Sequence, residues 1–181
     1  MLKRAILYRN QLCSLFVNAS DSPENKYFTP AYWDFEPKIE SSNWSKQQFV
    51  SVDKSDNVIA WLEADIAIKQ HYINNISIIR FNKNSYYDYL FSKDMYGFFS
   101  KLFFQYEYRK INYNVVIGSP QEKWYDKFTN IYGGRIVGIK KNHFLLENGK
   151  LLDLKIYEME KDPYIMAVNK RYPSLINKGK L

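Results

Sequence analysis

Two carboxylates in one apolar run have the residue type and the spacing that acid–base chemistry requires. Glu63 and Asp65 alternate with apolar residues, so in a β-strand both side chains project from the face that carries Trp61. A carboxylate placed in this way can accept a proton from a reacting group. Carboxylates on strands are also common as solvated surface groups, so a structural interpretation stays open beside the catalytic one.

Thiol and imidazole groups are few. The sequence contains one cysteine, Cys13, and two histidines, His71 and His143. A single thiol forms no internal disulfide, and these three residues do not have the spacing of a zinc site. Walker, dinucleotide-binding and serine-hydrolase motifs do not occur in the sequence either. We therefore expect a reduced, cytoplasmic protein that holds no metal.

The elements that must position these residues begin with one helix and four strands. Apolar spacing predicts a strand over residues 5–8, a helix behind Asn10, a hairpin of strands 49–53 and 58–69, and a strand over 76–81. The segment 20–48 mixes prolines with aromatic residues and is expected to be ordered but irregular.

The second half of the chain begins with a predicted helix over residues 94–108, which has an apolar stripe, and a strand over 111–117. A further helix is expected to start with Ser119 as N-cap and Glu122 completing a capping box, and to end at Gly133-Gly134. Strands over 135–146 and 151–159 then form a hairpin across residues 147–150.

One compact domain is expected from 181 residues of which 46% are apolar and 25% charged. The order of elements predicts an α/β fold, a mixed and mostly antiparallel sheet flanked by helices, over residues 1–160, followed by a basic tail over 161–181. No stretch has the roughly 18 consecutive apolar residues of a membrane span. The first residues also lack the features of a secretory signal.

Charge and aromatic content bear on partners. The net charge is +7, with most of the excess in residues 101–150, which suits a phosphorylated ligand. Nucleic-acid binding is the less favoured interpretation, because no recognition-module motif accompanies the charge. The 16 Tyr and 12 Phe exceed what a core of this size needs. Some of them are therefore expected at the surface, where they suit a protein interface or a binding groove.

The order of elements and the stretch NVVIGSPQEKWYDKFTNIYGGRIVG, residues 114–138, resemble the GCN5-related N-acetyltransferase superfamily over residues 1–160. The resemblance implies that the strand before this helix splays from its neighbour to admit acetyl-CoA, and that an acyl group passes directly to a primary amine. In that scheme Tyr125 matches the tyrosine that protonates the departing thiolate. Glu63 is our choice of base, with Asp65 second. A half-buried structural role for Tyr125 is the alternative.

The resemblance also implies which residues contact acetyl-CoA. The family holds the pyrophosphate on a glycine-rich loop at a helix start. Counting along the sequence places that loop at residues 90–95, which contain no glycine. The cofactor-binding residues we expect are Phe81, Ser92, Lys93, Met95, Ser119 and Lys123. The aromatic segment 27–44 is expected to line the acceptor side.

Three functions follow from these observations. The first is acetyl-CoA-dependent transfer to an amine of a small molecule or protein, in the cytoplasm. The second is a catalytically inactive protein of the same fold that serves as a structural or adaptor subunit of a larger assembly, such as a virion, through its aromatic surface and its tail. The missing glycine loop favours this second function. The third is binding of a nucleic acid.

Overall fold

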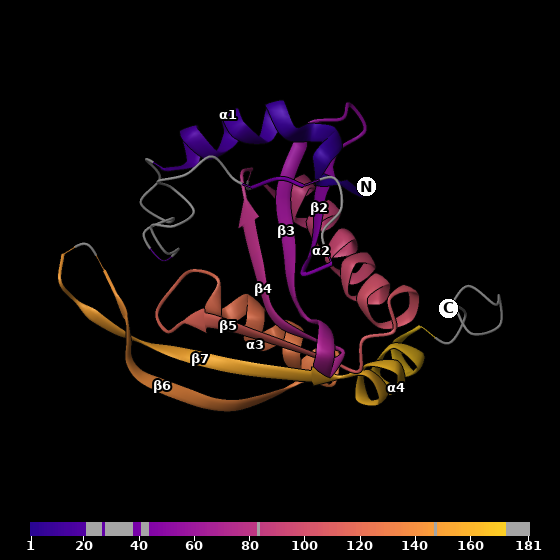
Figure 1. The fold of residues 1–181 in the computed structure, drawn as a ribbon, viewed down its shortest axis with the longest axis vertical. Coiled ribbons are helices and arrows are strands. Elements are labelled where there is room, and N and C mark those ends of the chain that lie inside the picture. Colours follow the sequence, from indigo (N-terminus) through magenta and orange to yellow (C-terminus); the bar gives the residue numbers. More distant parts are fainter. Residues whose placement is uncertain (21–26, 28–37, 41–43, 83, 147, 173–181) are drawn as a thin grey trace.

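The computed structural model describes residues 1–20, 27, 38–40, 44–82, 84–146 and 148–172. Its centre is a seven-stranded sheet in the order β1-β2-β3-β4-β5-β7-β6 (Figure 1). The strands are β1 (Leu2–Arg4), β2 (Lys46–Val52), β3 (Val58–Ala67), β4 (Tyr72–Arg80), β5 (Lys110–Val116), β6 (Arg135–Leu145) and β7 (Leu151–Glu160). The helices are α1 (Arg9–Ser20), α2 (Ser85–Ser100), α3 (Glu122–Ile131) and α4 (Lys161–Arg171). This is the expected mixed, mostly antiparallel sheet with flanking helices.

The two central strands separate soon after they meet. All neighbouring strands are antiparallel except β4 and β5, which run parallel. Within the described part of the chain, Ile73 of β4 and Ile111 of β5 are the only two residues of these strands that pair. Beyond them the strands splay, as the resemblance implied, and side chains rather than backbone hydrogen bonds must line the gap.

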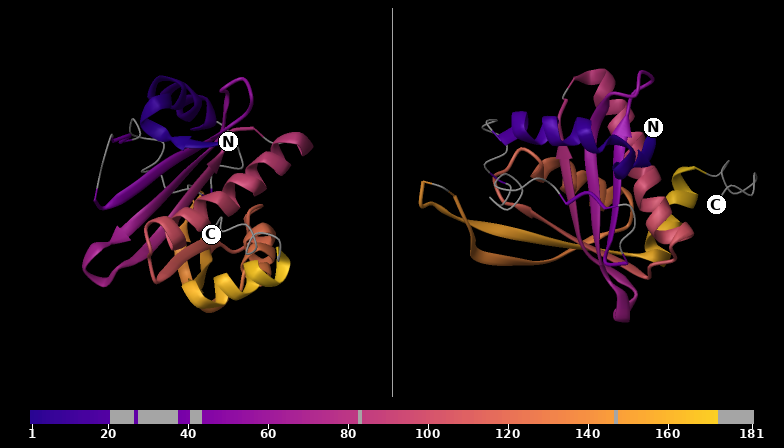
Figure 2. Two further views of the ribbon diagram at one scale, coloured as in Figure 1. Left: turned by 90° about the vertical axis from the view of Figure 1, so that its right-hand side faces the viewer. Right: turned by 45° about the horizontal axis from the view of Figure 1, so that its top comes forward.

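Strand β3 is buried on both faces of the sheet. Strand β3 alternates, so that Leu62 packs in the cluster with Phe98 of α2, while Trp61 packs in a second cluster with Phe16 of α1. Figure 2 shows the consequence, with α1 on one side of the sheet and α2 on the other. A strand with both faces covered is buried along most of its length, and β3 accordingly supplies a rigid support for the residues it carries.

The structure corrects two expected elements, the strand over residues 5–8 and the helix over residues 94–108. Residues Ala5–Tyr8 form a 3-10 helix and not a strand; the first strand is Leu2–Arg4. The helix expected to begin at residue 94 begins at Ser85, because the side chain of Asn84 caps it by accepting the N–H of Tyr87 (3.0 Å). It continues as a π-helical turn over Lys101–Gln105.

The segment expected to be a tail begins as a fourth helix. In α4, Tyr164 and Val168 have no exposed surface and belong to the cluster between α2 and the sheet. Residues 173–181 of the expected tail lie outside the described residues. Helix α4 is therefore part of the domain core. Among the described residues, no helix has the length and apolarity needed to cross a membrane.

Candidate active site

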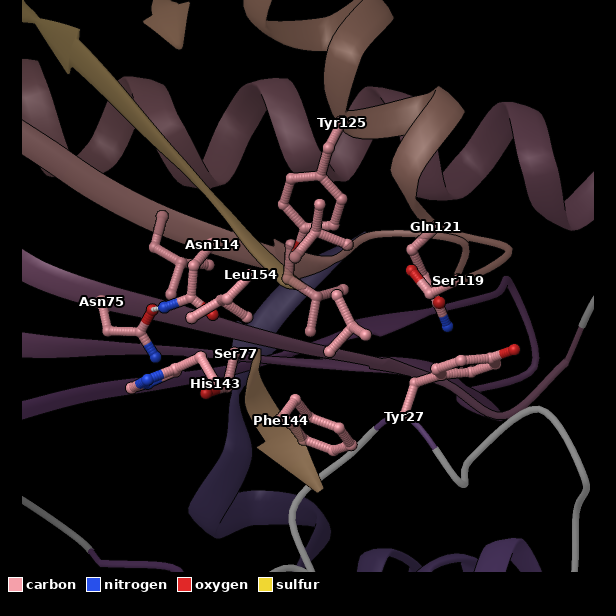
Figure 3. Close-up of a pocket in the computed structure, with 14 residues that line it drawn as sticks. Tyr27, Asn75, Ser77, Asn114, Ser119, Gln121, Tyr125, His143, Phe144 and Leu154 are labelled. Atoms are coloured by element: carbon pink, nitrogen blue, oxygen red, sulfur yellow. Dashed lines mark hydrogen bonds between the residues drawn. The ribbon is translucent and has the colours of Figure 1, made fainter. Parts of the chain in front are cut away.

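The splay between β4 and β5 opens into a cavity of about 360 Å³. Its described lining comes from β4, β5, the loop before α3, α3 itself, β6, β7 and one residue of the segment before β2 (Figure 3). The lining residues are Tyr27, Asn75, Ile76, Ser77, Ile78, Asn114, Val115, Val116, Ser119, Gln121, Tyr125, His143, Phe144 and Leu154. Polar uncharged groups converge here among apolar walls, which is the ordinary make-up of a small-molecule site.

An amide pair joins the two splayed strands at the cavity. The Asn114 side-chain nitrogen donates to the Asn75 side-chain oxygen (2.9 Å). This contact replaces the backbone ladder that the strands lose beyond Ile73 and Ile111. The pair thus bridges β4 and β5 while leaving the rest of the gap open.

Tyr125 projects from α3 into this cavity (Figure 3). Its ring is buried and lies nearly parallel to that of Tyr157, with centroids 6.1 Å apart, and 5.7 Å from that of Tyr113. The Tyr125 carbonyl accepts the Thr129 hydroxyl (2.7 Å), so Tyr113 must be the donor in its own 2.8 Å contact with Thr129. Burial raises the pKa of Tyr113, which keeps this donor protonated. The ring of Tyr125 is therefore held between two other tyrosine rings.

Helix α3 starts two residues later than expected, and Ser119 does not cap it. Gln121 occupies the N-cap position without a side-chain cap. The Glu122 carboxylate instead accepts the N–H of Gly118 (2.8 Å), which holds the turn before the helix. Burial acts to raise the pKa of Glu122, but this hydrogen bond and Lys155 outweigh it and the pKa is lowered.

Ser119 has a different position, in the wall of the cavity. It is 6% exposed, and its hydroxyl has no hydrogen-bond partner within the described structure. A buried hydroxyl without a partner costs free energy, and a bound polar group would remove that cost. The structure thus brings together Ser119 and Tyr125, two of the residues that the sequence predicted.

An ion cluster fixes α3 to the sheet. The Lys155 ammonium of β7 contacts Glu122 (2.5 Å) and Asp126 (3.0 Å) of α3, and the Tyr157 hydroxyl donates to Asp126 (2.8 Å). Burial acts to raise the pKa of Asp126, but Tyr157 and Lys155 outweigh it and lower the pKa. The carboxylates are thus held ionised, and the helix that carries Tyr125 is anchored by charge as well as by ring packing.

Glu63 is not in the described lining of the cavity. As the alternation along β3 predicted, Glu63 lies on the same face of the strand as Trp61, which packs in the cluster under α1. The Glu63 carboxylate is buried and contacts Lys46 (2.8 Å) and the Gln48 amide (2.6 Å). Asp65 contacts the same ammonium (2.9 Å). Because Glu63 is paired across the strands with Ser77, a lining residue, it lies one strand away from the cavity.

The expected cofactor residues other than Ser119 lie outside the cavity lining. Phe81 packs edge-to-face on Phe16 beneath α1, with ring centroids 5.3 Å apart. Residues 90–95 are not a loop but part of α2, which places Ser92 and Lys93 on its exposed side and buries Met95 completely in the core.

One expected residue, Lys123, and the acid next to Lys93, Asp94, complete this comparison. Asp94 is buried and contacts the Ser51 hydroxyl (2.6 Å) and the amino group of Met1 (2.7 Å). Lys123 is exposed on the first turn of α3. Most of the aromatic segment 27–44 lies outside the described residues, but Tyr27 lines the cavity.

Sequence reasoning missed His143. Successive residues of a regular strand point to opposite faces, yet His143 and Phe144 both line the cavity. The reason is an irregularity in β6, where the pairing of Lys140 with Leu154 is followed by that of Phe144 with Leu152. Asn142, with φ of +49°, lies inside it. Nothing in the local sequence marks a bulge at this point.

Comparison of the sequence with protein-family models and with curated proteins finds no match. Comparison with solved structures finds a spermidine N-acetyltransferase chimera of Vibrio cholerae SpeG and hSSAT, 18% identical, with a TM-score of 0.70 over 92% of this chain and 99% of that chain. A point mutant of Vibrio cholerae SpeG is 16% identical, with a TM-score of 0.63 over 91% and 97% of the two chains. Spermidine/spermine N-acetyltransferase SpeG with manganese is 18% identical, with a TM-score of 0.55 over 68% and 70%. At these identities the likeness shows the fold, which is that of the GCN5-related N-acetyltransferases.

Proposed function

We propose that this protein transfers an acetyl group from acetyl-CoA directly to a primary amine. The observation that carries the proposal is the placement of Tyr125, held on α3 with its side chain in a cavity that exists because β4 and β5 splay. A proton donor in a cleft between strands is an arrangement that suits transfer to a bound amine. The similarity of the fold to spermidine N-acetyltransferases supports an amine as the acceptor.

The cavity suits the acyl-bearing arm of acetyl-CoA in its chemistry. The apolar walls of the cavity include Ile78 and Leu154. The Ser119 hydroxyl, buried and without a partner within the described structure, offers a hydrogen bond to an amide of that arm. Among the described residues, no residue of β4 after Ile73 pairs with β5, so this edge of β4 faces the gap.

The nucleotide end would meet the start of α2. The first N–H groups of a helix have no partners within it and attract anions. Asn84 accepts the N–H of Tyr87, and the N–H groups of Ser85 and Tyr86 in the same first turn are candidates for a phosphate contact. Lys123, exposed on α3, is a candidate for a second phosphate contact. We therefore propose the first turn of α2, and not residues 90–95, as the pyrophosphate site.

In the proposed reaction, acetyl-CoA supplies the acyl group and this chain supplies the proton donor. Acetyl-CoA supplies a thioester, whose acyl carbon accepts the amine. Tyr125 is placed to give a proton to the leaving sulfur, and ring packing by Tyr113 and Tyr157 keeps it in position. Binding of the amine and the thioester side by side in one cavity supplies much of the acceleration.

Calorimetric titration with acetyl-CoA tests the proposal, with desulfo-CoA and ATP as comparisons. We expect saturable binding at micromolar concentrations, weaker binding of ATP, and acetyl transfer to members of an amine panel that starts with polyamines. Ser119→Phe fills the cavity from its wall and should abolish binding of acetyl-CoA. The matched control is Ser55→Phe, in the exposed turn between β2 and β3, which should bind as the wild type does.

An adaptor role without catalysis is the second candidate. Exposed apolar residues along β6 and its hairpin favour it, because a long edge strand with such residues is suited to a protein contact. They are Ile136, Val137, Ile139, Leu145 and Leu151. Absence of acetyl-CoA binding at millimolar concentrations would make this role the leading one and would overturn the acetyltransferase proposal.

A further inference from the structure

The bulge in β6 is a built feature of the cavity wall. Between the pairs Lys140–Leu154 and Phe144–Leu152, three residues of β6 stand opposite one residue of β7, Asp153. The Asp153 carboxylate accepts the N–H of Asn142 (3.0 Å) and the Lys141 ammonium (2.7 Å). Bulges of this kind redirect side chains and often lie next to active sites.

Asp153 also connects the bulge to the splayed strand. Its carbonyl accepts the N–H of Ile117 at the end of β5 (2.9 Å). The bulge is thereby fixed relative to the strand that opens the cavity. As a result, His143 and Phe144, neighbours in sequence, both face the cavity.

His143 is the described lining residue best suited to accept a proton at neutral pH. The other titratable groups in the described lining are the phenols of Tyr27 and Tyr125. Imidazole is the side chain that ordinarily changes charge between about pH 5 and pH 8, whereas phenols stay protonated there. The charged groups beside it at the bulge, Lys141 and Asp153, are paired with each other.

The expected base, Glu63, is placed less well for this task. Its carboxylate is committed to Lys46 and to the Gln48 amide, and it lies outside the described lining. Figure 3 shows Tyr125 entering the cavity from α3, and His143 of β6 lying beside Asn75 and Ser77. Two proton-handling groups that line one cavity can serve as acid and base in one reaction.

Resting on the proposed function, we propose that His143 is the general base of the transfer. As the amine nitrogen bonds to the acyl carbon, it gives its proton to His143. The bond between that carbon and sulfur breaks, and the thiolate takes the proton of Tyr125. Return of a proton from the imidazolium to the tyrosinate, through solvent, restores both residues. Asp153 and the bulge position the imidazole.

The test compares His143→Asn with His71→Asn, since these are the two histidines of the chain. His71 lies outside the described cavity lining, in a left-handed turn (φ +54°) that asparagine tolerates. We expect His143→Asn to lower kcat by about 100-fold with unchanged acetyl-CoA affinity, and to remove the acid limb of the pH profile of kcat/KM. His71→Asn should match the wild type in all three measurements.

A readout independent of turnover is the ring-proton NMR signal of each histidine, assigned by its loss in the corresponding variant. Acetyl-CoA should shift the His143 signal and leave that of His71 in place. A wild-type pH profile in His143→Asn, with an active wild type, would overturn the assignment while the proposed function stands. If Glu63→Gln instead removes the acid limb, the base is Glu63. A wild type that does not bind acetyl-CoA would overturn both proposals.

Discussion

Tyr125 combines a structural part and a chemical part in one side chain, and the two can be separated. Its ring packs against Tyr113, Tyr157 and Trp124, while its hydroxyl group lies toward the cavity. Phenylalanine keeps the ring and removes only the proton donor. We therefore expect Tyr125→Phe to lower kcat by about 100-fold with little change in KM or melting temperature, measured by steady-state kinetics and thermal unfolding.

The matched control is Tyr89→Phe, a tyrosine on α2 that is 69% exposed. This variant should be indistinguishable from the wild type. If Tyr125→Phe turned over at the wild-type rate in a working assay, the proton on the leaving sulfur would have to come from elsewhere. A large fall in melting temperature would instead assign Tyr125 to packing, the alternative that its buried ring leaves open.

At the scale of elements, the ion cluster between α3 and β7 makes stability depend on pH. The pKa values of Glu122 and Asp126 are lowered in the folded protein, so their contribution is present above the ordinary carboxyl range near pH 4 and is lost as the pH falls through the lowered values. The pKa of Lys155 is raised, so its contribution holds up to the ordinary lysine range near pH 10 and is lost only above it.

Lys155→Met should therefore destabilise the protein by about 2 kcal/mol at neutral pH, because two carboxylates lose a mostly buried cation. Asp126 is 41% exposed, and solvent screening keeps the loss below that of a fully buried pair. Urea unfolding at about pH 7 and about pH 3 should show the difference from wild type shrinking in acid. The control is Lys127→Met, at an exposed lysine of α3. An equal loss at both pH values would contradict this account.

The bulge yields a second prediction at this scale. Asp153→Ala removes the acceptor for the Asn142 N–H and for Lys141, and β6 can then relax toward regular alternation. His143 or Phe144 would turn out of the cavity, so kcat/KM should fall about tenfold or more while acetyl-CoA still binds. Asp153→Asn keeps an acceptor for the Asn142 N–H, so its kcat/KM should fall less than that of Asp153→Ala. Equal kinetics for Asp153→Ala and wild type would show that the bulge does not depend on Asp153.

Local patterns predicted most of the elements, and long-range contacts account for the failures. The apolar stripe of α2 was evident from Met95 onward, but its first turns carry tyrosines and an acid, and their helical state depends on the cap from Asn84. The face of Glu63 followed from alternation along β3, whereas its pairing with Lys46 depends on how β2 lies beside β3. His143 lines the cavity because β6 bulges there, and the Asp153 carboxylate of the next strand holds that bulge. These contacts join residues that are far apart in sequence, so they can be identified only once the fold is known.

At the scale of the whole molecule, α4 decides whether the end of the described chain is a docking tail or part of the core. Tyr164 has no exposed surface, its hydroxyl is 3.0 Å from that of Ser100, and its ring centroid lies 4.8 Å from that of Phe103. It connects α4 to α2 across the cluster that also supports α3. A partner could not use this side chain without opening the core.

Tyr164→Ala should consequently lower the free energy of unfolding by about 4 kcal/mol, since it deletes a buried aromatic ring and leaves a cavity among other rings. Met166→Ala lies on the same helix, at a side chain that is 69% exposed, and should change stability by less than about 0.5 kcal/mol. Denaturant unfolding of both variants measures the difference. Equal and small losses would mean that α4 is not held in the core and that it is available to a partner. A large loss for Tyr164→Ala alone would mean that any partner must bind another surface, such as the exposed apolar residues of β6.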